Sequence, residues 1–270
     1  MSKIAFIGAG NMNRAIIIGL INSGVTASDI IVSNPSPDKR LALAKEFGVK
    51  QTADNIEAAK ISEYIILGVK PHFMVEVCQQ LAATIDISKK CFISVAAGIT
   101  IAQLQQALGE KLPVVRTMPN TPSQLGLGVS GLYPSAQVNS EQKAFADQLM
   151  KAVGIVKWLD NESDIDHITA ISGSGPAYFF LFMEAMSDEA KRLGFSEQDA
   201  RQLVQQTALG AAQMVAENDS SISQLRENVT SKGGTTQAAL KSFTDGGLPQ
   251  LVSKSMQAAI SRAKEMAQDN

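Results

Sequence analysis

Between Lys3 and about Val156, short apolar runs rich in β-branched residues alternate with segments that have the apolar spacing of helices. Continuous apolar runs are typical of parallel strands buried on both faces, and helix-length segments between them can serve as crossovers. The pattern predicts a doubly wound α/β domain. The expected strands are Lys3–Ile7, Ile30–Val32, Tyr64–Leu67, Cys91–Val95 and Val114–Val115.

After about Asp160 the β-branched runs stop, and helical spacing takes over. Ser196 and Asp199 form a capping-box-like helix start. The pattern therefore predicts two domains, an α/β domain over residues 1–160 and an all-helical domain over residues 161–270. The clearest helical stripe, with a 3.6-residue period, consists of Ala200, Leu203, Val204, Thr207, Ala208, Ala211 and Val215.

The composition supports a globular protein and excludes some partners. The chain has 270 residues, of which 45% are hydrophobic and 19% charged, and Lys plus Arg number 24 against 26 for Asp plus Glu. A net charge of -2 gives no positive field to favour nucleic acid or anionic lipid. The longest apolar runs, such as Tyr64–Val69, are too short to span a bilayer, and no signal-peptide cleavage site follows Lys3. We expect a cytoplasmic protein that binds neither nucleic acid nor membranes.

A glycine-rich turn follows the first expected strand. Gly8-Ala9-Gly10 stands between a strand and a helix, the context in which such glycines hold a dinucleotide. The first glycine permits the tight turn, and the second lets the backbone approach a pyrophosphate at the helix N-terminus. Asn13 occupies the third position, where a small residue is expected, so the helix is expected to sit slightly farther from the sheet. The alternative is a structural turn without a ligand.

The end of the second strand bears on the type of dinucleotide. An NAD-preferring dehydrogenase places an acid there to bind the ribose hydroxyls. Here the stretch is Ser33-Asn34-Pro35-Ser36, followed by Lys39 and Arg40. Uncharged donors and cations suit a 2′-phosphate, although Asp38 weakens the inference and the two cations also fit a solvated helix face. We expect NADP(H), with NAD(H) used less efficiently.

Five further segments carry motifs that are specific when taken together: Val69-Lys70-Pro71, Ser94–Thr100, Arg116–Pro122, Gly173–Tyr178 and Val229–Thr236. Jointly they resemble those of the pyrroline-5-carboxylate reductases, which catalyse the last step of proline biosynthesis. The likeness covers nearly the whole chain. It departs from the family at Asn13 and at Lys232, where proline is usual. The resemblance implies an N-terminal Rossmann-type parallel sheet and an all-helical C-terminal dimerisation domain.

The resemblance also assigns site residues. It implies that Ser231 and the backbone of Gly234 and Thr235 bind the carboxylate of the cyclic imine, and that the Thr236 hydroxyl contacts the ring nitrogen. Without the family, the same residues would be taken for an ordinary helix cap. The dinucleotide-binding residues that it implies are Ile7, Gly8, Ala9, Gly10, Asn11, Met12, Asn34, Ser36, Asn55, Val69, Lys70, Pro71, Ala96, Ala97 and Gly98.

Candidates for acid–base, nucleophilic or metal chemistry are few. His72 and His167 are the two histidines, and His167 is expected to cap or cover a helix start. Cys78 and Cys91 lack metal-ligand spacing, so we interpret both as buried thiols and expect no metal. Reduction of a C=N bond does not require a strong acid on the enzyme, because the imine nitrogen can take its proton from solvent. The protein would then contribute proximity and orientation, with Thr236 as its catalytic residue.

Two other functions remain possible on sequence grounds. A 3-hydroxyacid dehydrogenase of the same layout needs a lysine four residues after the second glycine of its turn, but here Phe179 follows Gly175 at that spacing. A catalytically silent NADP-binding regulator would have no reason to keep an anion-binding turn. The helical half has more apolar and small-residue surface than one small bundle can cover, which predicts a homodimer. The resemblance adds that dimers can assemble into rings and that activity depends on association.

Overall fold

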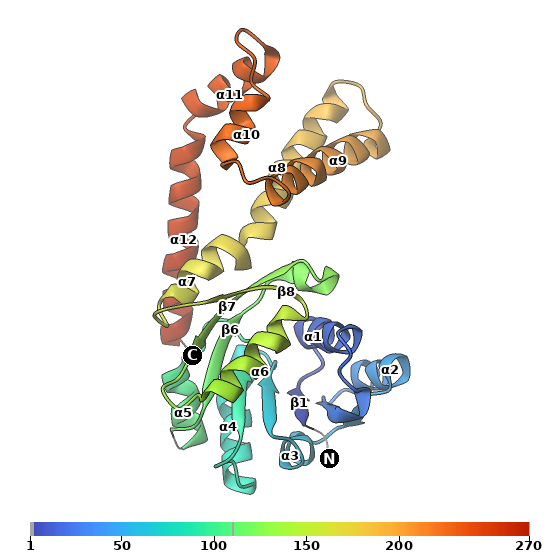
Figure 1. Ribbon diagram of the computed structural model, residues 1–270, viewed down its shortest axis with the longest axis vertical. Coiled ribbons are helices and arrows are strands. Elements are labelled where there is room, and N and C mark those ends of the chain that lie inside the picture. The colour runs from blue at the N-terminus through green and yellow to red at the C-terminus, as the bar shows by residue number, and fades with distance from the viewer. Residues whose placement is uncertain (1–2, 110, 270) are drawn as a thin grey trace. The chain divides into compact units, whose positions relative to one another are not determined.

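The computed structural model describes residues 3–109 and 111–269 (Figure 1). Contacts between residues divide the chain into two compact units. The first unit comprises the chain up to Ser174 together with the residues from Ala259 onward, and the second runs from Gly175 to Ala258. The predicted boundary at residue 160 stays a prediction, and the two units are described separately below.

The first unit contains an eight-stranded sheet with the order β3-β2-β1-β4-β5-β6-β7-β8. The predicted parallel arrangement is confirmed from β3 to β6, and β7 also runs parallel to β8. The strands are β1 (Ile4–Ile7), β2 (Ile30–Ser33), β3 (Lys50–Thr52), β4 (Tyr64–Leu67), β5 (Cys91–Ser94), β6 (Val114–Met118), β7 (Gly128–Pro134) and β8 (Gly154–Trp158).

Strands β3, β7 and β8 were not predicted, and β7 departs from the parallel pattern. β7 pairs antiparallel with β6. Only the short 3₁₀ segment η2 (Thr121–Leu125) lies between them, and an antiparallel neighbour needs no crossover helix. β3 consists of Lys50, Gln51 and Thr52 at one edge of the sheet, and it lacks the apolar run of a central strand.

Helices cover both faces of the sheet, as a doubly wound fold requires. One core cluster joins side chains of the strands to residues of α3, α4 and α5, and the cluster on the opposite face joins them to residues of α1, α2 and α6. The helices and short helical segments of this unit are α1 (Asn11–Asn22), η1 (Ala27–Asp29), α2 (Pro37–Phe47), α3 (Asn55–Lys60), α4 (Pro71–Thr84), α5 (Ile101–Leu108), α6 (Ser140–Lys151), α7 (Asp164–Ile168) and η3 (Thr169–Gly173).

Among the described residues of the second unit, every regular element is a helix, as predicted, and turns connect the helices. Ser196 caps α9 by accepting a hydrogen bond from the Asp199 amide at 3.1 Å. The predicted stripe on α9 is only partly covered within one chain, since Ala200 and Val204 are buried while Leu203 remains 49% exposed. The helices of the second unit are α8 (Gly175–Arg192), α9 (Glu197–Ala216), α10 (Ile222–Asn228), α11 (Thr235–Asp245) and the first part of α12 (Leu248–Asp269).

No helix among the described residues has the length and apolar content needed to cross a bilayer. Large apolar side chains nevertheless lie exposed on the second unit. Phe179 is 71% exposed, Leu181 67% and Leu251 60%. A folded unit that leaves this much apolar surface uncovered is typical of a chain that associates with a partner.

Candidate functional site

The glycine turn after β1 has a left-handed backbone at its first residue, as suits the tight turn that the sequence predicts. Gly8 has a φ of +97°, a conformation that residues with a Cβ rarely adopt. A Cβ at Gly8 would lie 2.8 Å from the carbonyl oxygen of Gly68, which follows the neighbouring strand β4. The turn therefore requires glycine both for its backbone angle and for the close approach of a second backbone segment.

The turn leads into the N-terminus of α1, which is open to an anion. Gly10 is the N-cap residue, no side chain caps the helix, and no acid stands in its first turn. The first amide groups of a helix lack partners within the helix and carry partial positive charge. The protein thus leaves this helix end without a negative charge of its own.

A cleft of about 490 Å³ lies over the carboxyl ends of β1, β2 and β4. This is where a doubly wound sheet binds its ligand. Asn34 and Ser36 line it together with Lys39, whereas Asp38 is not among the lining residues. The cleft contains Glu76, whose carboxylate accepts a hydrogen bond from Gln80 at 3.0 Å. Of the predicted dinucleotide-binding residues, those that line the cleft are Gly8, Ala9, Gly10, Asn34, Ser36, Asn55, Val69 and Lys70.

The other predicted dinucleotide-binding residues do not line this cleft. Ala97 and Gly98 line a separate pocket of about 150 Å³ beside Arg116. Asn11 lines a third pocket with Arg14. The four others lie elsewhere: Ile7 and Ala96 are buried, Met12 packs against a core cluster, and Pro71 opens α4.

Hydrogen bonds fix the polar groups of the cleft. The Asn34 side chain accepts from the Ala9 amide at 3.2 Å and donates to the Ser36 carbonyl at 3.0 Å. The Ser33 hydroxyl donates to the Asn55 side chain at 2.7 Å. The uncharged groups at the end of β2 are therefore held in place, and Lys39 adds a cation to the same wall.

Sequence reasoning missed the wall of the cleft that α4 provides. Phe73, Glu76, Val77 and Gln80 line it from successive turns of that helix. Their spacing of three and four residues places them on one face. Gly68, directly before the Val69-Lys70-Pro71 segment, was missed as well. The helical spacing after Pro71 was a usable signal for the α4 residues.

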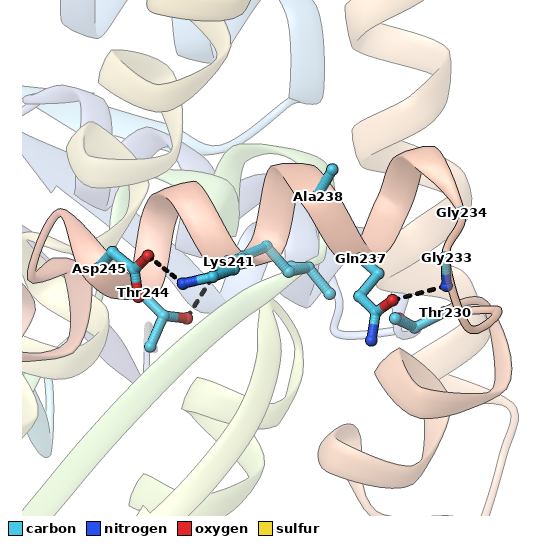
Figure 2. A pocket seen from close by; sticks show the side chains of 9 residues that line it. Thr230, Gly233, Gly234, Gln237, Ala238, Lys241, Thr244 and Asp245 are labelled. Atoms are coloured by element: carbon cyan, nitrogen blue, oxygen red, sulfur yellow. Dashed lines mark hydrogen bonds and ion pairs between the residues drawn. The ribbon is translucent and has the colours of Figure 1, made fainter.

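The second predicted site, in the other unit, is the turn before α11 (Figure 2). Gly233 has a φ of +74°, and its amide donates to the Gln237 side chain at 2.7 Å. Gly234 is the N-cap residue of α11, which has no side-chain cap and no acid in its first turn. A Cβ at Gly234 would lie 2.6 Å from the Ser231 hydroxyl oxygen, so glycine lets Ser231 approach the helix start.

A groove of about 640 Å³ runs from this turn along α11. Gly234 lines it, whereas Ser231, Thr235 and Thr236 are not among its lining residues. At the far end of the groove, Lys241 forms an ion pair with Asp245 at 2.5 Å, as Figure 2 shows. Like α1, α11 therefore begins at an uncapped glycine turn that can receive an anion.

The remaining candidates for chemistry occupy structural positions. His167 is paired with Asp164 at 3.2 Å on α7, and exposed His72 packs against the Phe73 ring. Cys78 and Cys91 are buried and free, and burial raises the pKa of both thiols to about 12. At neutral pH neither thiol is an effective nucleophile, because the thiolate is the reactive form.

Comparison with known proteins agrees with this architecture. Residues 162–266 match the model of the pyrroline-5-carboxylate reductase dimerisation domain, and residues 3–98 match that of the F420-dependent NADP oxidoreductases. Pyrroline-5-carboxylate reductase of Vibrio alginolyticus is 54% identical over 98% of this chain and 97% of its own length. The chain belongs to the pyrroline-5-carboxylate reductase family. The Pseudomonas aeruginosa enzyme of that name is 48% identical over the same shares of the two chains.

Solved structures of the family also superpose on the chain. A pyrroline-5-carboxylate reductase from Coxiella burnetii has a TM-score of 0.93 at 43% identity, and the match covers 98% of each chain. A Plasmodium falciparum pyrroline carboxylate reductase, solved with NADP bound, has a TM-score of 0.87 at 30% identity over 98% of each chain. The predicted fold class and family are thus confirmed: the chain is an oxidoreductase with a Rossmann-type sheet and a helical dimerisation segment.

Proposed function

We propose that this chain reduces L-1-pyrroline-5-carboxylate to L-proline with NADPH as the hydride donor. The observation that carries the proposal is the pair of uncapped helix starts at glycine turns, one at α1 and one at α11. The substrate carries a carboxylate and the cofactor a pyrophosphate, and each of these anionic groups can bind at the N-terminus of one of the two helices.

The cleft fits NADP(H) by its own geometry. Because Gly8 and Gly10 have no side chains, the loop backbone is accessible at the N-terminus of α1, where a pyrophosphate would bind. Asn34, Ser36 and Lys39 offer uncharged donors and a cation at the end of β2, which suits a 2′-phosphate better than a pair of ribose hydroxyls. Bound there, NADPH would supply a hydride, that is, a proton together with two electrons, to the substrate carbon and would become NADP⁺.

The substrate would be held by the turn before α11. The Thr235 amide and the Ser231 hydroxyl would bind the carboxylate, and the Gly234 amide, which donates to the Ser231 carbonyl at 3.0 Å, would share its hydrogen with the carboxylate. The Thr236 hydroxyl would accept a hydrogen bond from the protonated ring nitrogen. The C=N π bond breaks as the hydride forms a new C–H bond, and the electron pair becomes the lone pair of the secondary amine. The protein's role is orientation, because protonation of the imine by solvent already makes its carbon electrophilic.

Association of two chains forms part of the proposal. A second chain would bury the exposed apolar residues of α8, α9 and α12, and residues 162–266 match the model of a dimerisation domain. We propose a homodimer that can assemble further into a ring, in which hydride transfer depends on association. Light scattering at assay concentration should give a mass of at least twice 28.7 kDa. A fully active monomer would contradict this part. A cytoplasmic location, expected from the composition, also remains a proposal.

The decisive experiment measures NADPH oxidation by the purified protein over a panel of cyclic imino acids. Pyrroline-5-carboxylate should give the highest kcat/KM, and NADH should give a lower value than NADPH. A 3-hydroxyacid with NADP⁺ is the control for the alcohol-oxidising alternative and should give no reaction. If pyrroline-5-carboxylate causes no loss of NADPH or NADH absorbance, the proposed activity is wrong.

A further inference from the structure

The third position of the glycine fingerprint is filled by a buried polar side chain. Asn13 is only 1% exposed, and its amide nitrogen Nδ2 donates to the Gly8 carbonyl at 2.7 Å and to the Ile7 carbonyl at 3.3 Å. The room for it comes from Gly68, where a Cβ would lie 2.3 Å from the Asn13 amide atoms. Asn13 thus occupies the space that a side chain at position 68 would need, and it binds the carbonyl oxygens of the loop.

Both polar groups of the Gly8–Ala9 peptide are held by asparagine side chains. Its carbonyl oxygen accepts from Asn13, and its N–H donates to the Asn34 oxygen at 3.2 Å. This peptide directly follows the left-handed Gly8, the point at which the chain turns from β1 towards α1. Because glycine permits many backbone angles, a turn at this position needs outside contacts to keep one orientation.

Stability by itself does not explain the presence of Asn13. Its oxygen Oδ1 is buried and has no hydrogen-bond partner in the structure. A buried acceptor without a partner is destabilising, because it has lost its hydrogen bonds to water. A small apolar residue at position 13 would avoid this cost, so the contacts made by Nδ2 need a separate reason.

We infer that Asn13 is a positioning residue for the dinucleotide: with Asn34 it clamps the Gly8–Ala9 peptide and so orients the loop for the pyrophosphate. The inference rests on the NADPH binding proposed above. A loop already fixed in its bound orientation loses less conformational freedom when the ligand binds. Removal of the Asn13 contacts therefore weakens cofactor binding without touching the substrate turn.

The test separates hydrogen bonding from packing with the variants Asn13→Ala and Asn13→Ala/Gly68→Ala. The first removes the bonds and opens a cavity, whereas the second refills the space with the Gly68→Ala methyl group, which has no donor. Gly68 has no positive φ, so alanine suits its backbone. Asn22→Ala, at the exposed far end of α1, is the matched control.

We expect Asn13→Ala to raise the Kd for NADPH about tenfold, equivalent to about 1.4 kcal/mol. The Kd for NADH should rise by the same factor, because the pyrophosphate is common to both. The double variant should recover a melting temperature close to that of the wild type yet keep the weakened Kd. In steady state, KM for NADPH should rise, while kcat at saturating NADPH and KM for the pyrroline stay unchanged. Asn22→Ala should match the wild type throughout.

Two results would overturn the inference. One is wild-type NADPH affinity in Asn13→Ala, and the other is full recovery of affinity in the double variant, which would show that Asn13 only fills space. If Asn13→Ala fails to fold, the double variant decides alone. Wild-type protein that binds neither NADPH nor NADH would instead overturn the proposed cofactor site, and the inference with it.

Discussion

Substitution of the first turn glycine tests the link between backbone geometry and cofactor binding most directly. In Gly8→Ala, the residue must keep a φ near +97° or the turn must change. The left-handed strain costs about 1–3 kcal/mol. The new Cβ would also stand 2.8 Å from the oxygen and 3.1 Å from the carbon of the Gly68 carbonyl, which belong to backbone and cannot rotate away.

Together these effects predict a loss of about 3 kcal/mol, since overpacking adds about 1–3 kcal/mol to the strain and partial relaxation offsets some of it. At about 2–4 °C per kcal/mol for a chain of this size, Tm should fall by about 6–12 °C. The single tryptophan, Trp158, lies in β8 of the same sheet, so its fluorescence reports the melting of this unit. A fluorescence titration with NADPH should show that binding is lost as well.

Gly10→Ala is the matched control. Gly10 has an extended backbone with a φ of -72°, and a Cβ there would lie 3.8 Å from the Gly68 oxygen, an ordinary contact. Alanine is a poorer N-cap than glycine by up to about 1 kcal/mol, so Tm should fall by at most about 4 °C. NADPH binding should still weaken, because the methyl group separates the loop from the pyrophosphate. Equal melting temperatures for Gly8→Ala and the wild type would refute the argument from backbone strain.

Three further substitutions test other parts of the molecule. Thr236→Val should lower kcat/KM about fivefold, the equivalent of one hydrogen bond of about 1 kcal/mol, with the Kd for NADPH unchanged; wild-type kinetics would remove Thr236 from the mechanism. Lys39→Ala should raise KM for NADPH but not for NADH, and an equal change for both would place Lys39 away from the 2′-phosphate. Lys90→Met should lower Tm, because Lys90 Nζ donates to the buried carbonyls of Ala59 at 2.8 Å and Ser62 at 2.7 Å. Burial also lowers the pKa of Lys90, so the unfolded chain binds this proton more tightly than the folded chain does. The free energy of unfolding of the wild type, relative to that of Lys90→Met, should therefore rise with pH up to about 10.5. A difference between the two proteins that stays constant from pH 8 to 10.5 would contradict this sign.

The central strands and the first glycine turn followed from the sequence because their signals are local. Strands β1, β2, β4 and β5 are buried along their whole length, so their residues are apolar except for Ser33 and Ser94 at the strand ends. Gly8 directly follows such a run, and its role depends on its own φ. The capping of α9 by Ser196 is similarly decided within one helical turn.

Other features depended on residues that the sequence separates. Strands β3, β7 and β8 lie towards or at the edges of the sheet, where polar residues are tolerated and the apolar signal is weaker. The antiparallel direction of β7 depends on which neighbour it pairs with, and no local pattern records that choice. The α4 wall of the cleft became visible only after the helix had packed beside the sheet.

The sequence by itself determined five of the eight strands, the turn at Gly8 and the family, because spacing and motif are properties of neighbouring residues. Asn13 shows what was left to tertiary structure. In the sequence it was a departure expected to push α1 from the sheet, but in the structure Gly68 leaves the space for its side chain and Gly8 supplies an acceptor. Whether a buried polar residue fits depends on the atoms that surround it, and folding brings those atoms from distant parts of the chain.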